Sequence, residues 1–133
     1  MTRPTALVTG ATSGIGAVFA RYLAERGHDL VIVARDEVRL NQRATDWRSA
    51  HGVDVEILRA DLSKQEEIAR VAARLSDMSR PIEVLINNAG FGINKSFTNS
   101  TSSEEQALLD VLVTAPMRLM HSALPIMKER DKG

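Results

Sequence analysis

Apolar runs of strand length alternate along the chain with segments in which apolar residues recur at the helical period. The strand-like runs cover residues 6–8, 30–34, 53–57 and 82–86. Residues 30–34 are apolar throughout, which is typical of a strand buried on both faces of a parallel sheet. Residues 53–57 alternate apolar and charged positions, as an edge strand with one solvent-exposed face does. Strands separated by helical segments predict an α/β fold.

The first helix is expected directly after the first strand. Its apolar residues at helical spacing predict a buried stripe that consists of Ile15, Val18, Phe19, Tyr22 and Leu23. Arg26 in the last turn and Gly27 after it are typical of a helix C-terminus.

Three further helices are predicted. The first covers about 36–50 and turns Leu40, Ala44 and Trp47 inward, with Gly52 beyond its end. The second begins with a capping box at 63–66. Its buried stripe is Ile68, Val71, Ala72 and Leu75. A polar loop over 91–102 precedes the third helix, about 103–128, in which Pro116 is expected to introduce a kink.

The length of 133 residues predicts one domain over 1–133. Seventeen basic and seventeen acidic residues give a net charge of zero, without blocks of like charge, so neither nucleic acid nor a membrane surface is an expected partner. The absence of cysteine excludes disulfides, thiolate metal sites and a cysteine nucleophile. No signal peptide and no apolar run of membrane-spanning length are apparent, which favours a cytoplasmic location.

The turn between the first strand and the first helix carries the most specific chemistry. Gly10, Gly14 and Gly16 are spaced G-x-x-x-G-x-G. Glycines let the backbone approach a pyrophosphate, and the following helix N-terminus offers unpaired N–H groups and a positive dipole end. An ordinary glycine-rich turn is the alternative, but the strand–turn–helix context favours a dinucleotide site. The other turn residues expected at the phosphates are Thr12, Ser13 and Ile15.

The end of the second strand distinguishes the two nicotinamide cofactors. An acidic residue there would bind the ribose hydroxyls of NAD, whereas this chain has Ala34 followed by Arg35. A guanidinium suits a 2′-phosphate, so NADP(H) is predicted over NAD(H). A solvated surface arginine is the alternative for Arg35. Asp36 comes next and is expected to be the N-cap of the following helix.

With these features the chain resembles the short-chain dehydrogenase/reductase family over essentially its whole length. Thr9-Gly10-x-x-x-Gly14-Ile15-Gly16 is similar to that family's cofactor turn, Asp61-Leu62 to its adenine-flanking pair, and Asn87-Asn88-Ala89-Gly90 to its second signature. The resemblance implies a Rossmann-type doubly wound parallel sheet with flanking helices, truncated to strand order 3-2-1-4.

The same resemblance implies roles for individual residues. Asp61 would accept a hydrogen bond from the adenine amino group, and the Leu62 amide would serve a ring nitrogen. Asn88, with Ala89 and Gly90, would lie at the ligand end of the fourth strand. For Asn88, the alternative is a loop asparagine that only hydrogen-bonds to local backbone. For Asp61 and Ser63, the alternative is a capping role at the following helix, and for Ser63 this role is preferred.

Family members use a serine and a Tyr-x-x-x-Lys pair to exchange hydride between nicotinamide and a carbonyl or alcohol. This sequence has no Tyr-x-x-x-Lys, and its only tyrosine is Tyr22, predicted on a buried stripe. Leu112 aligns with a family asparagine that anchors a proton-relay water. We therefore expect the NADP(H)-binding portion of an oxidoreductase, inactive as this chain alone. A non-catalytic binding or oligomerisation module and a remnant without a ligand are the alternatives.

Strand order 3-2-1-4 places the fourth strand at a sheet edge, available to another chain. Apolar residues of the last helix would also lack a cover: Leu108, Leu112, Leu119 and Met120. A homo-oligomer through the last helix or the fourth strand is therefore expected.

Overall fold

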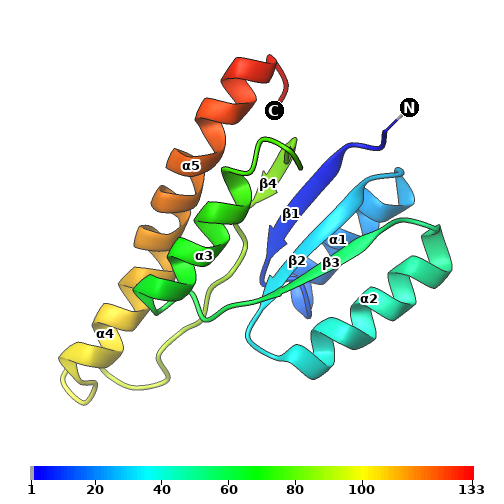
Figure 1. Cartoon of the computed structure of the whole chain (residues 1–133). Coiled ribbons are helices and arrows are strands. Elements are labelled where there is room, and N and C mark those ends of the chain that lie inside the picture. Colours follow the sequence, from blue (N-terminus) through cyan, green and yellow to red (C-terminus); the bar gives the residue numbers. More distant parts are fainter. Residues whose placement is uncertain (1) are drawn as a thin grey trace.

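The computed structural model describes residues 2–133, and its centre is one parallel sheet (Figure 1). The strands are β1 (Thr5–Thr9), β2 (Asp29–Ala34), β3 (Val55–Arg59) and β4 (Val84–Ile86). They lie in the order β3-β2-β1-β4, as predicted, with β3 and β4 at the edges. Both edge strands begin two residues later than the sequence pattern indicated.

Helices cover both faces of this sheet. They are α1 (Gly14–Glu25), α2 (Glu37–His51), α3 (Gln65–Leu75), α4 (Ser102–Leu109) and α5 (Ala115–Arg130), with a π-helical turn over Asp110–Thr114. Figure 1 shows α1 and α2 on one face and α3 with α5 on the other. The chain therefore has the doubly wound α/β architecture.

The two central strands contribute to two hydrophobic cores because successive side chains point to opposite faces of a sheet. Leu7 and Val31 pack in the core under α3 and α5, while Val8 and Ile32 pack in the core under α1 and α2. All four are at most 1% exposed. Each such side chain stabilises the fold by about 1.5–3 kcal/mol, which explains why these strands are apolar throughout.

The predicted buried stripe of the first helix is wrong. Four of its five residues are 43% to 69% exposed: Ile15, Val18, Phe19 and Tyr22. The face of α1 that meets the sheet consists of Gly16, Ala20 and Ala24. Small residues allow close helix–sheet contact, so the large apolar side chains lie outside the core. Tyr22 instead carries the Arg26 guanidinium 3.4 Å from the centre of its ring.

The predicted faces of α2 and α3 are confirmed. Leu40, Ala44 and Trp47 are at most 4% exposed, Asp36 is the N-cap of α2, and Gly52 is its left-handed C-cap with φ +65°. In α3, Ile68, Val71 and Leu75 are buried and Ala72 is half-buried.

The last helix runs from Ser102 to Arg130, and its π turn ends at Thr114, two residues before Pro116. Proline has no N–H to donate to the carbonyl four residues back, so this is the part of the helix where regular α-helical bonding fails. Of the residues expected to lack a cover, Leu112 and Met120 are 47% and 45% exposed. Leu119 is fully buried in the core against α3, which corrects that expectation.

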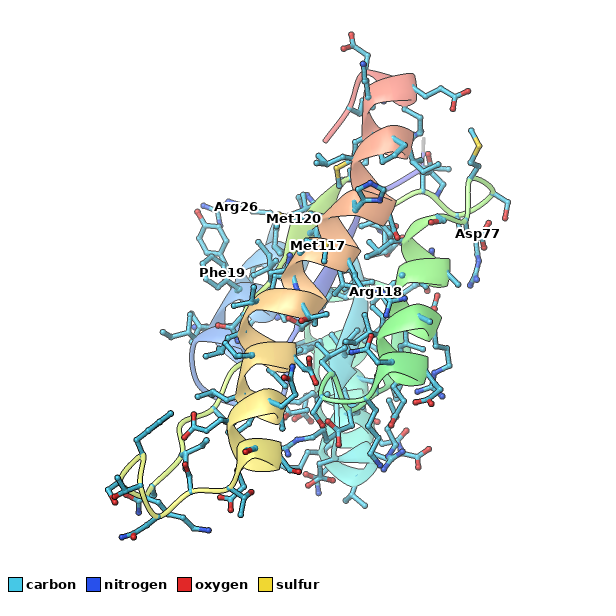
Figure 2. All side chains as sticks on the ribbon, turned by 90° about the vertical axis from the view of Figure 1, so that its left-hand side faces the viewer. Phe19, Arg26, Asp77, Met117, Arg118 and Met120 are labelled. Atoms are coloured by element: carbon cyan, nitrogen blue, oxygen red, sulfur yellow. The ribbon has the colours of Figure 1, made fainter. Side chains whose placement is uncertain are left out.

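This helix also corrects the expectation that no segment has membrane-spanning length. Ser102–Arg130 is long and apolar enough to cross a membrane by length and composition, and 22% of its most apolar window is buried here. Part of its apolar surface packs on the core, and part is exposed. In Figure 2, Met117 and Met120 of α5 and Phe19 of α1 face the same side of the molecule.

Candidate functional site

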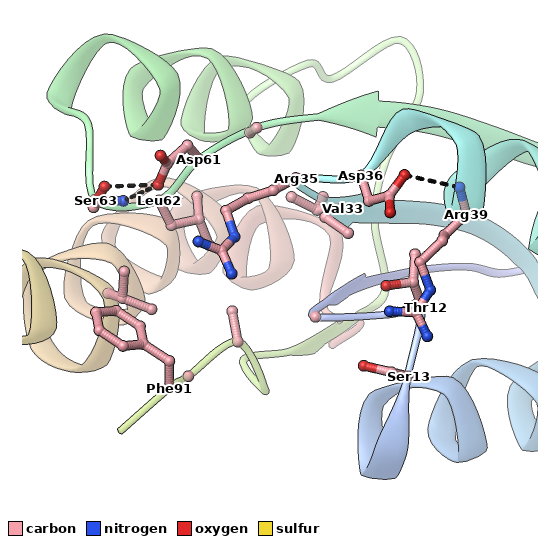
Figure 3. A pocket seen from close by; sticks show the side chains of 16 residues that line it. Thr12, Ser13, Val33, Arg35, Asp36, Arg39, Asp61, Leu62, Ser63 and Phe91 are labelled. Atoms are coloured by element: carbon pink, nitrogen blue, oxygen red, sulfur yellow. Dashed lines mark hydrogen bonds between the residues drawn. The ribbon is translucent and has the colours of Figure 1, made fainter. Parts of the chain in front are cut away.

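A cavity of about 480 Å³ lies where the carboxyl ends of the four strands meet (Figure 3). Open α/β sheets bind ligands at this end, where the strand order reverses. Eight of the twelve predicted site residues line the cavity: Gly10, Thr12, Ser13, Arg35, Asp61, Leu62, Ala89 and Gly90. Segments far apart in the sequence thus form one pocket.

The glycine turn has a backbone conformation and a close packing that larger residues would not tolerate. Gly10 and Gly14 have φ of +63° and +56°, a region that favours glycine. A Cβ atom on Gly16 would lie 2.1 Å from the Gly10 carbonyl oxygen and 2.4 Å from Nδ2 of Asn88. Ser13 is the N-cap of α1, and its hydroxyl makes no capping bond. The turn can therefore present backbone amides and a free hydroxyl to an anion.

Asn88 does not line the cavity; it joins the turn after β4 to the turn after β1. Its Nδ2 donates to the carbonyl oxygens of Thr9 and Gly10, each at 3.3 Å. The backbone amides of Asn88 and Ala89 both donate to Oγ1 of Thr9 at 3.0 Å. Thr9 is fully buried, and its hydroxyl donates to the Ile86 carbonyl at 3.4 Å. Asn88 thus does hydrogen-bond to backbone carbonyl groups, but these belong to the other turn and are not its local neighbours.

Asp61 is half-buried at the end of β3, and its carboxylate organises the turn before α3. Oδ1 accepts from the Ser63 hydroxyl at 2.7 Å and the Ser63 amide at 3.0 Å. Burial raises the pKa of Asp61, but the two bonds from Ser63 and the charges of Arg35 and Lys64 outweigh burial and hold the pKa below its ordinary value. Asp61 is therefore an anionic acceptor beside the cavity.

The predicted capping box at 63–66 is wrong. Lys64 is the N-cap of α3, without a side-chain bond. Ser63 is engaged by Asp61 two residues earlier, in the manner of an Asx turn. Glu67 Oε1 accepts from the Asp61 amide at 3.0 Å instead. Ser63 therefore stabilises the turn at Asp61 and does not cap α3.

Two arginines approach the cavity from the β2–α2 connection. Figure 3 shows the Arg35 side chain on the side of Asp61 and Leu62, while that of Arg39 extends toward Thr12 and Ser13. Asp36 fixes this connection, because its Oδ1 accepts from the Arg39 amide at 3.1 Å.

Sequence reasoning missed several contributors to the site. Arg39 lines the cavity, and so do Phe91 and Val111. Arg43 donates from Nε to the Thr12 carbonyl at 3.1 Å and so holds the glycine turn. A signal existed for Arg39, a second arginine shortly after Arg35 in the first turn of the predicted helix, but nothing in the sequence indicated the direction of its side chain.

Other predicted residues lie outside the cavity. The Ile15 side chain is 69% exposed on the outer face of α1, so only its backbone amide is in place to meet an anion. Leu112 lies beside the second signature, since a Cβ on Gly90 would be 3.1 Å from its Cδ2. Tyr22 is not among the cavity residues.

The sheet order, the glycine turn and the cavity define a dinucleotide-binding α/β domain of the Rossmann type. The chain matches the short chain dehydrogenase family over residues 4–133 and belongs to that family.

Relatives and solved structures agree. The ketoacyl reductase HetN of Nostoc sp. is 35% identical over the whole chain, which covers 46% of that protein. The bulky-bulky ketone specific alcohol dehydrogenase from Comamonas testosteroni superposes with a TM-score of 0.94 at 40% identity, over 100% of this chain and 53% of that one. A short-chain dehydrogenase from Sphingobium yanoikuyae in complex with NADPH gives a TM-score of 0.93 at 44% identity, over 98% and 50%. The chain thus spans about half the length of these proteins.

Proposed function

We propose that this chain is the NADP(H)-binding portion of a short-chain dehydrogenase/reductase. The observation that carries the proposal is the glycine turn before α1, which lies beside a cavity at the ligand end of the sheet and is packed so closely that a Cβ on Gly16 would lie 2.1 Å from the Gly10 carbonyl oxygen. The pyrophosphate would lie at the start of α1 and the adenine between Arg35 and the Asp61–Leu62 pair. A related protein bound to NADPH supports this assignment.

The preference for NADP(H) rests on the end of β2. Arg35 follows the strand directly, and the nearby Asp36 carboxylate already accepts the Arg39 amide. Calorimetric titration of the 133-residue protein should give tighter binding of NADPH than of NADH. Arg35→Ala should remove most of that difference, because the dianionic phosphate loses a charged donor. Identical preferences before and after the substitution would contradict the assignment.

We further propose that the chain by itself does not transfer hydride. In the longer family members, the proposed reaction interconverts a carbonyl and an alcohol through a Tyr-x-x-x-Lys pair that this sequence does not contain. NADPH absorbance should stay constant when the protein is mixed with ketone substrates. Turnover by the pure chain would contradict this proposal.

A binding module that never had a catalytic partner is the second candidate. The mass of the protein in its native source separates the two. A mass near 14.6 kDa favours the binding module, and about twice that mass favours one half of an oxidoreductase.

Self-association is proposed through the open side of β4. β4 is an edge strand, and three exposed apolar residues of two helices, Phe19 of α1 with Met117 and Met120 of α5, face one side of the molecule (Figure 2). Unpaired strand edges and apolar patches favour pairing with another chain. Sedimentation should show a dimer or larger species at micromolar concentration. Met120→Lys should dissociate it, whereas Val38→Lys, at an exposed apolar position on α2, should not.

A further inference from the structure

The glycine turn between β1 and α1 is tied by hydrogen bonds to other parts of the chain. These bonds join successive residues of the turn to three elements: Gly10 to Asn88 after β4, Ala11 to Val33 of β2, and Thr12 to Arg43 of α2. Nε of Arg43 donates to the Thr12 carbonyl oxygen at 3.1 Å, against 3.3 Å for each of the other two bonds. The bond from Arg43 is also the last of these before α1 begins.

The peptide group that joins Thr12 to Ser13 lies between two glycines. Gly10 and Gly14 have φ of +63° and +56°, and glycine changes backbone conformation more easily than other residues. The Ser13 hydroxyl makes no capping bond, and no acceptor for the Ser13 amide is found among residues 2–133. The orientation of this peptide group is therefore set from outside the turn, at the Thr12 carbonyl.

The direction of the Ser13 amide follows from that of the Thr12 carbonyl. The C=O and N–H of one trans peptide group lie in one plane and point in opposite directions. Because the Thr12 carbonyl faces Arg43 on α2, the Ser13 N–H faces away from α2. Thr12 and Ser13 both line the cavity at the carboxyl end of the sheet. A side chain on α2 thus sets the direction of a free backbone donor at the cavity.

The surroundings of Arg43 keep its side chain directed at the turn. Arg43 is half-buried, and its guanidinium carbon lies 6.0 Å from the centre of the Trp47 ring, a distance at which a cation and an aromatic ring attract each other. Trp47 follows one turn later on α2 and is buried in the core under α1 and α2. No acidic side chain among residues 2–133 forms an ion pair with Arg43, so no carboxylate competes with the Thr12 carbonyl for it.

We propose that Arg43 is a positioning residue for the pyrophosphate of the dinucleotide. By holding the Thr12 carbonyl, it aims the Ser13 amide at the phosphate before the ligand arrives. Arg43 is not among the residues that line the cavity, so it acts through the turn and not by contact. An amide that is already oriented spares the ligand the cost of ordering it, which raises affinity. This inference rests on the proposed NADP(H) function, which places the pyrophosphate at the start of α1.

The test compares the binding of ADP with that of adenosine, which lacks the pyrophosphate group. Both are titrated into the wild-type chain and into Arg43→Met, Arg43→Lys and Arg48→Met. Proton–nitrogen NMR spectra report the affinities and the signal of the Ser13 amide, and urea unfolding reports stability. Arg48 is the matched control, because it lies on the same helix and also donates to a backbone carbonyl, that of Val55 in β3 rather than one in the glycine turn.

Arg43→Met should weaken the binding of ADP roughly tenfold, the usual effect of losing a charged hydrogen bond, and leave adenosine within about twofold. The Ser13 amide signal of the ligand-free protein should shift or broaden, because the peptide group is no longer held. Arg43→Lys keeps a charged donor and should recover part of the affinity for ADP. Arg48→Met should lower the urea midpoint and leave both affinities and the Ser13 signal unchanged.

Equal losses for ADP and adenosine in Arg43→Met would make Arg43 a purely structural residue, and unchanged binding of ADP would show that the turn is positioned without it. Both results overturn the positioning role and leave the proposed NADP(H) function intact. A wild-type chain that binds ADP no better than adenosine would also overturn the role, since the turn would then not bind the pyrophosphate. A wild-type chain that binds neither ADP nor NADPH would overturn the proposed function itself.

Discussion

The two ends of the sheet are both hollowed and rich in arginine, yet their charges are arranged differently. The amino end carries the larger hollow, about 690 Å³ against about 480 Å³ at the carboxyl end. At the amino end Arg74 pairs with Glu56 at 3.0 Å and Arg130 with Glu83 at 3.5 Å. At the carboxyl end Arg35 and Arg39 have no acidic partner among the described residues. The pairing of charges, rather than volume, therefore distinguishes the ligand site.

The difference has a physical basis. Paired charges satisfy one another and hold loops and strands together, so an incoming anion gains little from them. Other groups remain hydrated until a ligand replaces the water: unpaired guanidinium groups, the free backbone amides at the start of α1, and the Ser13 hydroxyl, which makes no capping bond. Changes at the carboxyl end should thus act mainly on binding, and changes at the amino end mainly on stability.

The largest effect is expected from Gly16→Val, which should abolish nucleotide binding. Its Cβ would overlap the Gly10 carbonyl oxygen and Nδ2 of Asn88, so the glycine turn and its link to β4 must separate. Overpacking of this kind costs about 1–3 kcal/mol in unfolding free energy. Urea unfolding and NADPH titration measure the two effects.

Gly92→Ala is the matched control for that substitution. Gly92 has open space around its Cβ position and no positive φ, so both measurements should match the wild type. A Gly16→Val protein that binds NADPH normally would show that the close approach at Gly16 is not needed.

Arg74→Met should separate stability from binding at the amino end. The Arg74 side chain is 7% exposed, and it donates to Glu56 and to the Arg80 carbonyl at 2.7 Å. Breaking a buried pair costs about 3–5 kcal/mol, but Glu56 is 36% exposed and retains Arg80, so we expect about 2 kcal/mol. Affinity for NADPH should remain unchanged. A large loss of affinity without a loss of stability would contradict the division between the two ends.

Thr9→Val should affect both properties, because Thr9 lies inside the core at the carboxyl end. The variant removes the oxygen that accepts the amides of Asn88 and Ala89, leaving them without that partner at a cost of about 1–3 kcal/mol. NADPH affinity should fall several-fold as the second signature shifts. Thr9→Ser keeps the hydroxyl and should restore binding. Equal binding by the valine and serine variants would exclude a positioning role for Thr9.

The resemblance to the family predicted the strand order. Hydrophobic periodicity predicted the inner faces of α2 and α3, because periodicity reports burial when a helix has one apolar face. It failed for α1, which has two such faces. The face of Gly16, Ala20 and Ala24 meets the sheet, and the larger residues beside it dominate the pattern. Which of the two faces meets the sheet depends on the size of the side chains that fit against it, and hydrophobic periodicity carries no information on side-chain size.

For the site, the sequence located the turns but not the directions of side chains between them. The glycine turn, Arg35 and Asp61 do line one cavity, as adjacent carboxyl ends of parallel strands require. Arg39 extends toward Thr12 and Ser13 (Figure 3), a direction set by how α2 is placed relative to α1 in three dimensions. Ser63 failed as a cap because Asp61, two residues earlier, competes for its hydroxyl and amide.

The smallest effect is expected from Asp77→Asn, in the turn after α3. Hydrogen bonds from the Ser79 hydroxyl and Arg80 lower the pKa of Asp77 from 3.8 to about 2. The ionised form is therefore favoured in the folded protein. Its stabilising effect is complete above the unfolded pKa and is lost as the pH falls toward about 2.

The melting temperatures of the wild type and Asp77→Asn should differ slightly near neutral pH and converge in that acid range. NADPH affinity at neutral pH should be the same for both, since Asp77 belongs to the internally balanced charges. A difference in melting temperature that persists near pH 2 would mean that the effect comes from side-chain geometry rather than from charge. A change in affinity would show that the two ends of the sheet are coupled.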